Sequence, residues 1–481
     1  MKRTPGSALT NVQWTSMSQI ARVGLQLTSV MVMARILPAS DFGLLAMATI
    51  VTNFAGIFRD LGTSAAIIQR QELSRALLDT VFWSNILFGF LVGGIIAATS
   101  PLVATAFHDP AVQPLLVISS LAFPIGASGA PHLALLERSS RFKIVSIIEV
   151  FSSICGAVVA IGAAISGVGA ISLVIQALIG TILSTALFWL VSRWRPRAQW
   201  SKAEIVEVLG FSGNLVAFNV INYFSRNADG MLIGRYLGPV QLGYYTIAYR
   251  IMLFPLQNLT FVLTRAFLPI FSGQQQNTAL IGRQYLRLLQ FIFVITAPLM
   301  LGLWSVREPF VVVVLGEKWQ PASDIVAWLA PTGLLQSIVS TTGTVLIATG
   351  KTRLMRNLGL VCSLIYLTGF VLGLSQGGVG VARAYFFANI LTSVIYLHYT
   401  VIQVNLDLSD VVVSLCRPLL AALVMVVLII SIEHLILPGS WHHIAKLALL
   451  VLVGTAIYAA TMIVAARDIV VDMRAAVLKK A

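Results

Sequence analysis

Five arginines lie inside long apolar stretches of the sequence: Arg22, Arg59, Arg226, Arg250 and Arg265. A charged side chain at the depth of a lipid bilayer is costly, so it normally faces a water-filled cavity or an ionic partner instead of lipid. The planar guanidinium group binds phosphate and carboxylate groups through paired hydrogen bonds. These residues therefore predict a cationic chamber within a membrane domain, and an anionic cargo for it.

Other polar residues accompany these arginines at a helical spacing. They recur every three or four residues, a period that places each set on one face of a helix. The first apolar stretch carries Asn11, Thr15, Ser18, Arg22, Gln26 and Ser29, and the seventh carries Asn219, Asn222, Arg226 and Asp229. The second carries Asn53, Gly56, Arg59, Asp60 and Ser64, and the eighth carries Thr246, Arg250, Gln257 and Thr264. We predict that these four helices line the chamber.

The predicted binding set for the cargo is drawn from these stripes. It consists of Arg22, Arg59, Arg226, Arg250, Asn219, Asn222 and Gln26. The competing interpretation is structural, because polar residues also join membrane helices to one another. For the uncharged residues the two interpretations are equally supported. Arg22 and Arg226 lie near mid-span and favour the chamber, whereas Arg59 and Arg265 lie near span ends, from which they can extend to the membrane surface.

Two acidic residues, Asp60 and Asp229, lie beside the arginines of these stripes. One interpretation is that they neutralise Arg59 and Arg226 by ion pairing. The other is a protonation or cation site that couples transport to an H⁺ or Na⁺ gradient or to the membrane potential. Glu149 also lies in an apolar stretch, with weaker support for a coupling role. We expect no cofactor.

Membrane-spanning helices must position these residues, and the composition provides them. The 481 residues are 58% hydrophobic and 10% charged, with a mean hydropathy of +0.89. About 20 apolar residues cross a bilayer as one helix, so the fold class is an all-α integral membrane protein of about fourteen spans. We place the spans near residues 9–36, 42–68, 78–106, 112–136, 144–166, 168–192, 212–236, 240–271, 284–305, 321–348, 356–374, 378–403, 412–437 and 443–466.

Basic residues concentrate in alternate loops between these spans, as the positive-inside rule requires. The loops predicted to face the cytoplasm carry Arg70, Arg75, Arg138, Arg141, Lys143, Arg193, Arg195, Arg197, Lys202, Arg283, Arg287, Lys351, Arg353 and Arg356. The opposite loops carry only Arg35, Arg235, Arg307, Lys318 and Lys446. We predict a multi-pass protein with both termini cytoplasmic, an arrangement that twelve spans would satisfy equally. The net charge of +14 is spread between spans and does not indicate nucleic acid.

An internal repeat divides the chain into halves. Residues 35–43, Arg-Ile-Leu-Pro-Ala-Ser-Asp-Phe-Gly, match residues 235–243, Arg-Tyr-Leu-Gly-Pro-Val-Gln-Leu-Gly. Repeated halves that meet at the bilayer midplane are typical of alternating-access transporters. The predicted domains are an amino-terminal lobe at 1–192, a basic cytoplasmic linker with a short interfacial helix at 193–211, a second lobe at 212–404, and the last two spans with a cytoplasmic tail at 405–481.

Enzyme motifs are not found in the sequence. The six histidines do not form the H-E-x-x-H spacing of a zinc protease. Gly350-Lys351-Thr352 resembles the end of a phosphate-binding loop, but Val345 stands where that loop requires glycine. The three cysteines lie in or beside apolar stretches without metal-ligand spacing. We therefore predict a transporter with no catalytic residues and no metal site.

Several short segments resemble the polysaccharide transporter family of the multidrug/oligosaccharidyl-lipid/polysaccharide (MOP) superfamily, which contains the Wzx-type flippases. In the first half they are Ala-Arg-Ile-Leu-Pro-Ala-Ser-Asp-Phe-Gly-Leu at 34–44, Phe-Arg-Asp-Leu-Gly at 58–62 and Ala-Ile-Ile-Gln-Arg at 66–70. In the second half they are Asp-Gly-Met-Leu-Ile-Gly-Arg at 229–235, Leu-Gly-Tyr-Tyr at 242–245, Tyr-Arg at 249–250 and Leu-Gly-Glu-Lys-Trp at 315–319. Together these segments extend over most of the chain.

The resemblance implies two pseudo-symmetric six-helix lobes around a central cavity, plus two carboxy-terminal helices, in a bacterial inner membrane. It implies flipping of undecaprenyl-pyrophosphate-linked oligosaccharide repeat units from the cytoplasmic to the periplasmic leaflet, for exopolysaccharide or lipopolysaccharide synthesis. Cationic cavity residues of the superfamily lie on the first, second, seventh and eighth helices, which here selects Arg22, Arg59, Arg226 and Arg250. The implied partners are the lipid-linked oligosaccharide, membrane lipids, and the polymerase and export machinery of the same pathway.

Three other functions compete with this prediction. A cation-coupled drug or metabolite exporter of the same superfamily would favour acidic and aromatic residues for a cationic cargo. A lipid II flippase would use a similar cationic chamber. A polymerase or glycosyltransferase of the pathway would need a long loop outside the membrane, and the predicted loops are short.

Overall fold

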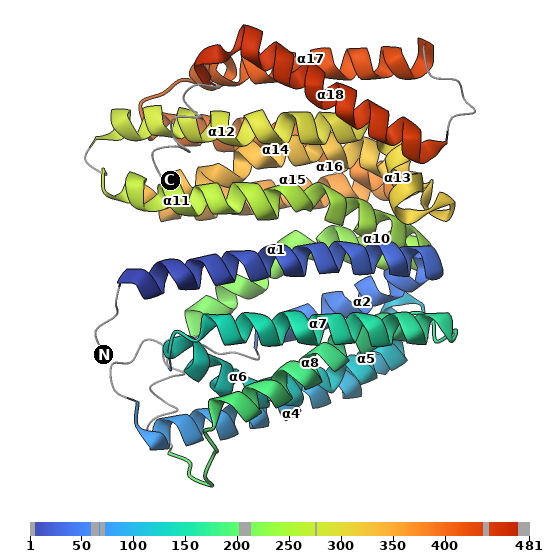
Figure 1. The fold of residues 1–481 in the computed structure, drawn as a ribbon, viewed down its shortest axis with the longest axis vertical. Helices are drawn as coiled ribbons and strands as arrows, with labels where there is room; N and C mark the ends of the chain where they lie inside the picture. Colours follow the sequence, from blue (N-terminus) through green and yellow to red (C-terminus); the bar gives the residue numbers. More distant parts are fainter. Residues whose placement is uncertain are drawn as a thin grey trace. The chain divides into compact units, whose positions relative to one another are not determined.

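The computed structural model describes residues 5–58, 67, 73–201, 213–274, 277–435 and 442–469. Every regular element within these ranges is a helix (Figure 1), which confirms the predicted all-α class. The helices of the first part are α1 (Pro5–Ile36), α2 (Ala39–Gly56), α4 (Arg75–Phe107), α5 (Val112–Ser120), α6 (Ala122–Arg138), α7 (Phe142–Ile165), α8 (Ile171–Ser192) and α10 (Gly213–Pro255). Those that follow are η1 (Leu256–Thr260), α11 (Phe261–Ser272), α12 (Thr278–Ser305), α13 (Arg307–Leu315), η2 (Glu317–Trp319), α14 (Ala322–Ala348), α15 (Thr352–Gly373), η3 (Leu374–Gln376), α16 (Gly377–Ile402), α17 (Leu408–Leu435) and α18 (His443–Ala465).

Nine segments of the described chain are long and apolar enough to cross a membrane. They are Arg75–Phe107, Val112–Arg138, Phe142–Ile165, Ile171–Ser192, Thr278–Ser305, Ala322–Ala348, Thr352–Ile402, Leu408–Leu435 and His443–Ala465. Thr352–Ile402 holds both α15 and α16, so these nine segments correspond to ten of the predicted spans. The other four predicted spans are those with polar stripes, and they are not among the nine segments found in the described residues. A total of fourteen spans stays a prediction.

Local sequence determines where several helices begin. Ser74 precedes α4, and its hydroxyl accepts a hydrogen bond from the backbone N–H of Leu77 at 3.0 Å. The side chain of Asn277 caps α12 in the same way, accepting from the N–H of Leu280 at 3.0 Å. Such caps satisfy backbone donors that have no partner within the helix. The short interfacial helix predicted after Ser201 lies outside the described residues.

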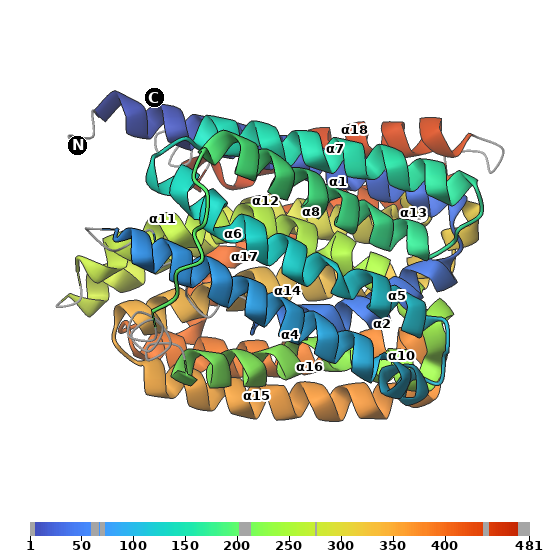
Figure 2. The same cartoon turned by 90° about the horizontal axis from the view of Figure 1, so that it is seen from below.

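The chain folds into two compact units, Met1–Gly243 and Tyr244–Ala481. In the first unit α7 packs against α1 and α8, and α4 packs against α6 (Figure 2). In the second unit α12 packs against α14 and α17, and α16 packs against α14 and α15. The boundary falls within α10, beyond the kink at Gly238, so the predicted seventh span at 212–236 lies in the first unit. The four domains predicted from the sequence stay a prediction.

The two copies of the internal repeat contact each other reciprocally within the first unit. A Cβ atom placed on Gly43 would lie 1.7 Å from the backbone oxygen of Pro239, and one on Gly243 would lie 1.9 Å from the backbone oxygen of Ala39. Gly43 of the first copy therefore contacts Pro239 of the second, and Gly243 of the second copy contacts Ala39 of the first. Only glycine allows so close an approach of two backbones. The sequence repeat thus corresponds to a pseudo-twofold contact between the first turns of α2 and the part of α10 that directly follows the kink at Gly238.

Candidate functional site

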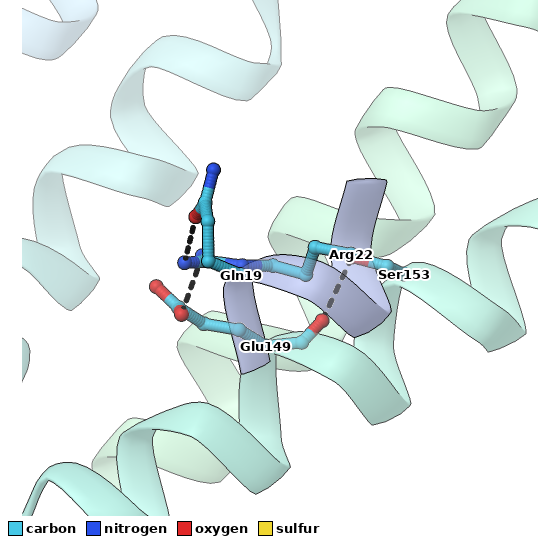
Figure 3. A network of polar contacts seen from close by, with 4 residues as sticks. All are labelled: Gln19, Arg22, Glu149 and Ser153. Atoms are coloured by element: carbon cyan, nitrogen blue, oxygen red, sulfur yellow. Dashed lines mark hydrogen bonds and ion pairs between the residues drawn. The ribbon is translucent and has the colours of Figure 1, made fainter. Parts of the chain in front are cut away.

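The most definite charged site in the described chain joins α1 to α7 (Figure 3). The Arg22 Nη1 atom lies 2.6 Å from Glu149 Oε2, in an ion pair between residues 127 positions apart in sequence. The Nη2 atom of Arg22 donates a hydrogen bond to Gln19 Oε1 at 3.0 Å. Helix packing therefore holds the guanidinium group between a carboxylate and an amide oxygen.

Both partners of this ion pair are only partly covered by protein. The side chain of Arg22 is 34% exposed and that of Glu149 is 29% exposed. The Nε atom of Arg22, by contrast, is buried and has no hydrogen-bond partner within the described residues. Because guanidinium has five N–H donors, the ion pair with Glu149 and the hydrogen bond that Arg22 donates to Gln19 leave donor capacity that an anionic ligand can use.

Local helix geometry positions both side chains. Gln19 precedes Arg22 by three residues, so the two lie on neighbouring turns of the same face of α1. On α7 the hydroxyl group of Ser153 donates to the backbone carbonyl oxygen of Glu149 at 2.7 Å (Figure 3). A second contact holds α1 in the same bundle, because Ser29 and the amide of Gln176 on α8 exchange hydrogen bonds of 3.3 Å and 2.9 Å.

Glu149, the ionic partner of Arg22, is not in the binding set predicted from the sequence. The sequence shows an acid within an apolar stretch, which is a signal for function, but periodicity relates only residues of one helix. Which helices pack together is a tertiary property, so the pairing of Arg22 with Glu149 could not be read from spacing. Gln19, in contrast, continues the polar period of α1 and could have been added to the stripe.

The other predicted residues of the first unit that the structure describes are Gln26, Arg226 and Asp229. Gln26 is exposed on α1 and Arg226 is exposed on α10. Within the described residues neither makes a hydrogen bond or an ion pair to Arg22. Asp229 is buried, and its Oδ1 atom accepts a hydrogen bond from the backbone N–H of Gly230 at 2.7 Å.

The other predicted residues lie outside the described residues or in the second unit. Arg59 and Asp60 lie outside the described residues, as do the side chains of Asn219 and Asn222 on α10 and of Arg265 on α11. Arg250 lies on the last turns of α10, in the second unit. The complete binding set therefore stays a prediction.

Tyr223 and Phe224, which lie on α10 just before Arg226, pack against α2. The hydroxyl group of Tyr223 donates to the backbone oxygen of Ile50 at 2.5 Å, and its ring lies 5.7 Å from that of Phe54. Phe224 also contacts Phe54, at a ring separation of 5.2 Å. This packing fixes the rotation of the segment that carries Arg226.

An uncharged polar network lies in the second unit, between α14, α15 and α16. The hydroxyl group of Tyr366 donates to Asn389 Oδ1 at 3.2 Å and lies 2.7 Å from Thr392 Oγ1. Gln336 donates to the hydroxyl group of Tyr385, whose ring lies 5.4 Å from that of Tyr366. Sequence analysis missed this network because it carries no charge. This network in the second unit joins three helices through neutral hydrogen bonds, whereas the Arg22 site in the first unit joins two helices through an ion pair.

Removing the Tyr366 hydroxyl group by Tyr366→Phe is expected to lower the stability of the second unit. The change leaves Asn389 Oδ1 without that donor, and Asn389 is fully buried. We expect a loss of about 1 kcal/mol, since hydrogen bonds between membrane helices contribute that much. The thermal-denaturation midpoint of the detergent-purified protein measures it. Tyr399→Phe, at a residue that is 45% exposed, is the matched control; equal midpoints for the two variants would contradict the assignment.

No group of three or more histidine, cysteine or acidic side chains is arranged to hold a metal ion within the residues that the structure describes. The ion pair of Arg22 and Glu149 is a charged feature on one of the four helices predicted to line the chamber. Its chemistry suits an anion, because guanidinium donates only and carries a permanent positive charge.

Comparison with known proteins relates the chain to polysaccharide biosynthesis. The family model described as "Polysaccharide biosynthesis protein" matches residues 32–324. The lipopolysaccharide biosynthesis protein WzxC of Escherichia coli (strain K12) is 27% identical over 80% of this chain and 79% of its own. The teichuronic acid biosynthesis protein TuaB of Bacillus subtilis (strain 168) is 27% identical over 94% of both chains.

The fold is also found among solved structures. The lipid II flippase MurJ, in an inward closed conformation, superimposes with a TM-score of 0.76, covering 96% of this chain and 100% of that one. The identity is 18%, so the likeness concerns the fold alone. The described helices thus follow an arrangement already seen in a membrane transporter.

Proposed function

This chain belongs to the polysaccharide biosynthesis protein family, and we propose that it flips undecaprenyl-pyrophosphate-linked oligosaccharide repeat units from the cytoplasmic to the periplasmic leaflet. The family, with its MOP-superfamily fold, makes it a multi-pass membrane transporter of polysaccharide biosynthesis and not an enzyme. The proposal adds the cargo, the direction and the mechanism. The product would be an exopolysaccharide or a lipopolysaccharide.

The observation that carries the proposal is the half-buried guanidinium group of Arg22 on a helix of a membrane protein. A polyprenyl-pyrophosphate sugar has an apolar tail, an anionic linker and a polar head. The tail can remain in lipid while the linker and head need a polar, cationic environment. Arg22 offers charge and hydrogen-bond donors of the geometry that phosphate groups accept.

The proposed mechanism is alternating access between the two leaflets. Inverted or repeated halves are the usual basis of such motion. The reciprocal contacts of Gly43 with Pro239 and of Gly243 with Ala39 support a repeat in this chain. In the proposal Arg226, Arg250 and Arg59 complete the cationic chamber. The coupling of transport to an ion gradient is assigned to Asp229 and Asp60, of which Asp229 is buried on α10.

Two alternatives within the superfamily remain distinguishable by their cargo. A drug exporter for cationic compounds is disfavoured, because the site built around Arg22 offers positive charge and donors. A lipid II flippase would also bind a polyprenyl pyrophosphate, and only the sugar attached to it differs. The family match and the relatives in lipopolysaccharide and teichuronic acid synthesis favour the polysaccharide repeat unit.

Depletion of the protein from its host is the direct test of this function. We expect lipid-linked repeat units to accumulate on the cytoplasmic leaflet, where a membrane-impermeant sugar-modifying reagent added to intact cells cannot reach them. Re-expression of the wild-type chain should restore their access to the reagent. Accumulation of lipid II instead would support the peptidoglycan alternative, and no accumulation of any lipid-linked sugar would overturn the proposal.

A further inference from the structure

The cationic site at Arg22 already holds an anion, the carboxylate of Glu149. The Nη1–Oε2 distance of 2.6 Å is that of a charge-assisted hydrogen bond. An anionic ligand that uses this face of the guanidinium group must therefore displace Glu149 or share Arg22 with it. Gln19 is neutral and holds the Nη2 atom at 3.0 Å, so it competes much less strongly for a charged ligand.

The energetic outcome of that competition depends on the charge of the ligand. Coulomb attraction to Arg22 scales with the ligand's charge, while the attraction lost by Glu149 is fixed. A ligand with one negative charge gains about as much attraction to Arg22 as Glu149 loses. Its binding also leaves the partly buried carboxylate of Glu149 without an ionic partner, which costs free energy. A ligand with two or more charges gains more than the carboxylate loses.

The anionic lipids of a bilayer differ in headgroup charge, and lipids of either charge can compete for a partly exposed cationic site. Arg22 and Glu149 are each about one-third exposed, 34% and 29%, so neither is sealed from lipid headgroups or cargo. The common anionic phospholipids are phosphodiesters with one negative charge, whereas a sugar-linked pyrophosphate carries two. Without a resident carboxylate, Arg22 would bind the abundant singly charged lipids as well.

We propose that Glu149 is a specificity-determining residue that sets a charge threshold at Arg22. A singly charged phospholipid headgroup must displace Glu149 from Arg22 at a net cost in free energy, so it is excluded. A pyrophosphate-linked lipid gains more attraction to Arg22 than Glu149 loses, so it is admitted. This inference rests on the proposed function, because it assumes a lipid-linked pyrophosphate as the cargo. It assigns Glu149 a role that the predicted binding set of arginines and amides did not contain.

The test measures competition between lipids for the full-length protein. The wild type and Glu149→Gln are reconstituted in nanodiscs of phosphatidylcholine, and binding of fluorescent undecaprenyl pyrophosphate is titrated. Glutamine keeps the size of the side chain and an oxygen that can accept from Arg22 but removes the charge. Phosphatidylglycerol and phosphatidic acid then replace part of the phosphatidylcholine, at about pH 8, above the second phosphate pKa near 6. Phosphatidylglycerol thus offers about one charge, and phosphatidic acid about two.

In the wild type we expect phosphatidic acid to compete for the site at least about tenfold better than phosphatidylglycerol, a factor equivalent to about 1.4 kcal/mol. In Glu149→Gln this ratio should fall to within about twofold, because the singly charged lipid no longer has to displace a carboxylate. The matched control is Glu433→Gln, since Glu433 forms a 2.8 Å ion pair with Lys446 between α17 and α18 and is 18% exposed. This control should keep the wild-type ratio.

The possible failures are distinguishable. If the wild type does not bind undecaprenyl pyrophosphate, the proposed function fails. If it binds that lipid but phosphatidylglycerol competes as well as phosphatidic acid, no charge threshold exists and the inference is overturned, whether or not the variant folds. An unchanged ratio in a folded Glu149→Gln protein would show that a threshold exists but that Glu149 does not set it.

Discussion

Flipping of lipid-linked repeat units is expected to fall by about tenfold to a hundredfold in Arg22→Ala. A hydrogen bond to a charged group contributes about 1.5–3 kcal/mol, and each 1.4 kcal/mol corresponds to a factor of ten. Arg22→Lys should retain part of the activity, because ammonium keeps the charge but not the bidentate geometry. The measurement is the rate at which repeat units become accessible on the periplasmic side of cells that express only the variant.

The control for this prediction separates loss of binding from loss of folding. Alanine at position 22 leaves Glu149 unpaired, and removing one partner of a fully buried pair costs about 3–5 kcal/mol. The cost here should be smaller, since both side chains are about one-third exposed. The double variant Arg22→Gln, Glu149→Gln removes both charges and should regain stability without regaining flipping. Wild-type flipping in the double variant would contradict the role of Arg22.

Replacing Gly43 or Gly243 by alanine is expected to destabilise the first unit more than replacing Gly24 or Gly94 by alanine. The added Cβ would lie 1.7 Å from the oxygen of Pro239 or 1.9 Å from that of Ala39, and backbone atoms cannot rotate away as side chains do. Overpacking typically costs about 1–3 kcal/mol, and a clash with backbone belongs at the upper end of that range. Thermal denaturation of the purified variants measures the effect.

Two helical glycines provide the matched controls for this change. Gly24 on α1 and Gly94 on α4 have no neighbouring atom within 4 Å of an added Cβ. Alanine at these positions should be neutral or slightly stabilising, because alanine favours a helix over glycine by about 1 kcal/mol. If Gly43→Ala were as stable as Gly24→Ala, the close contact between the two repeat copies would be refuted.

Much of the fold follows from local properties of the sequence. The predicted spans at 144–166 and 443–466 agree closely with α7 (Phe142–Ile165) and α18 (His443–Ala465). Each is a predominantly apolar run of membrane length, so its limits follow largely from composition. The span predicted at 240–271 is less regular, because α10 ends at Pro255 and the π-helical turn η1 precedes α11. A π-helical turn replaces i→i−4 hydrogen bonds locally, which hydropathy does not register.

The site shows where sequence reasoning ends. Arg22 was recognisable because a charge within an apolar helix is costly wherever that helix packs, and its stripe follows from the helical period. Its partner Glu149 lies on a helix 127 residues further along, and only the packing of α1 against α7 brings the two together. The same holds for Tyr366 and Asn389, which carry no charge that would mark them in sequence.

By itself the sequence determined the all-helical membrane class, the repeat and the arginine-bearing helix faces, because hydrophobicity and helical period act over neighbouring residues. Only the tertiary structure decided that the cationic site is occupied by a carboxylate of the protein. It also decided that the two repeat copies meet through Gly43 and Gly243. Both are contacts between distant segments, whose energies depend on distances of a few ångströms that a one-dimensional pattern does not contain.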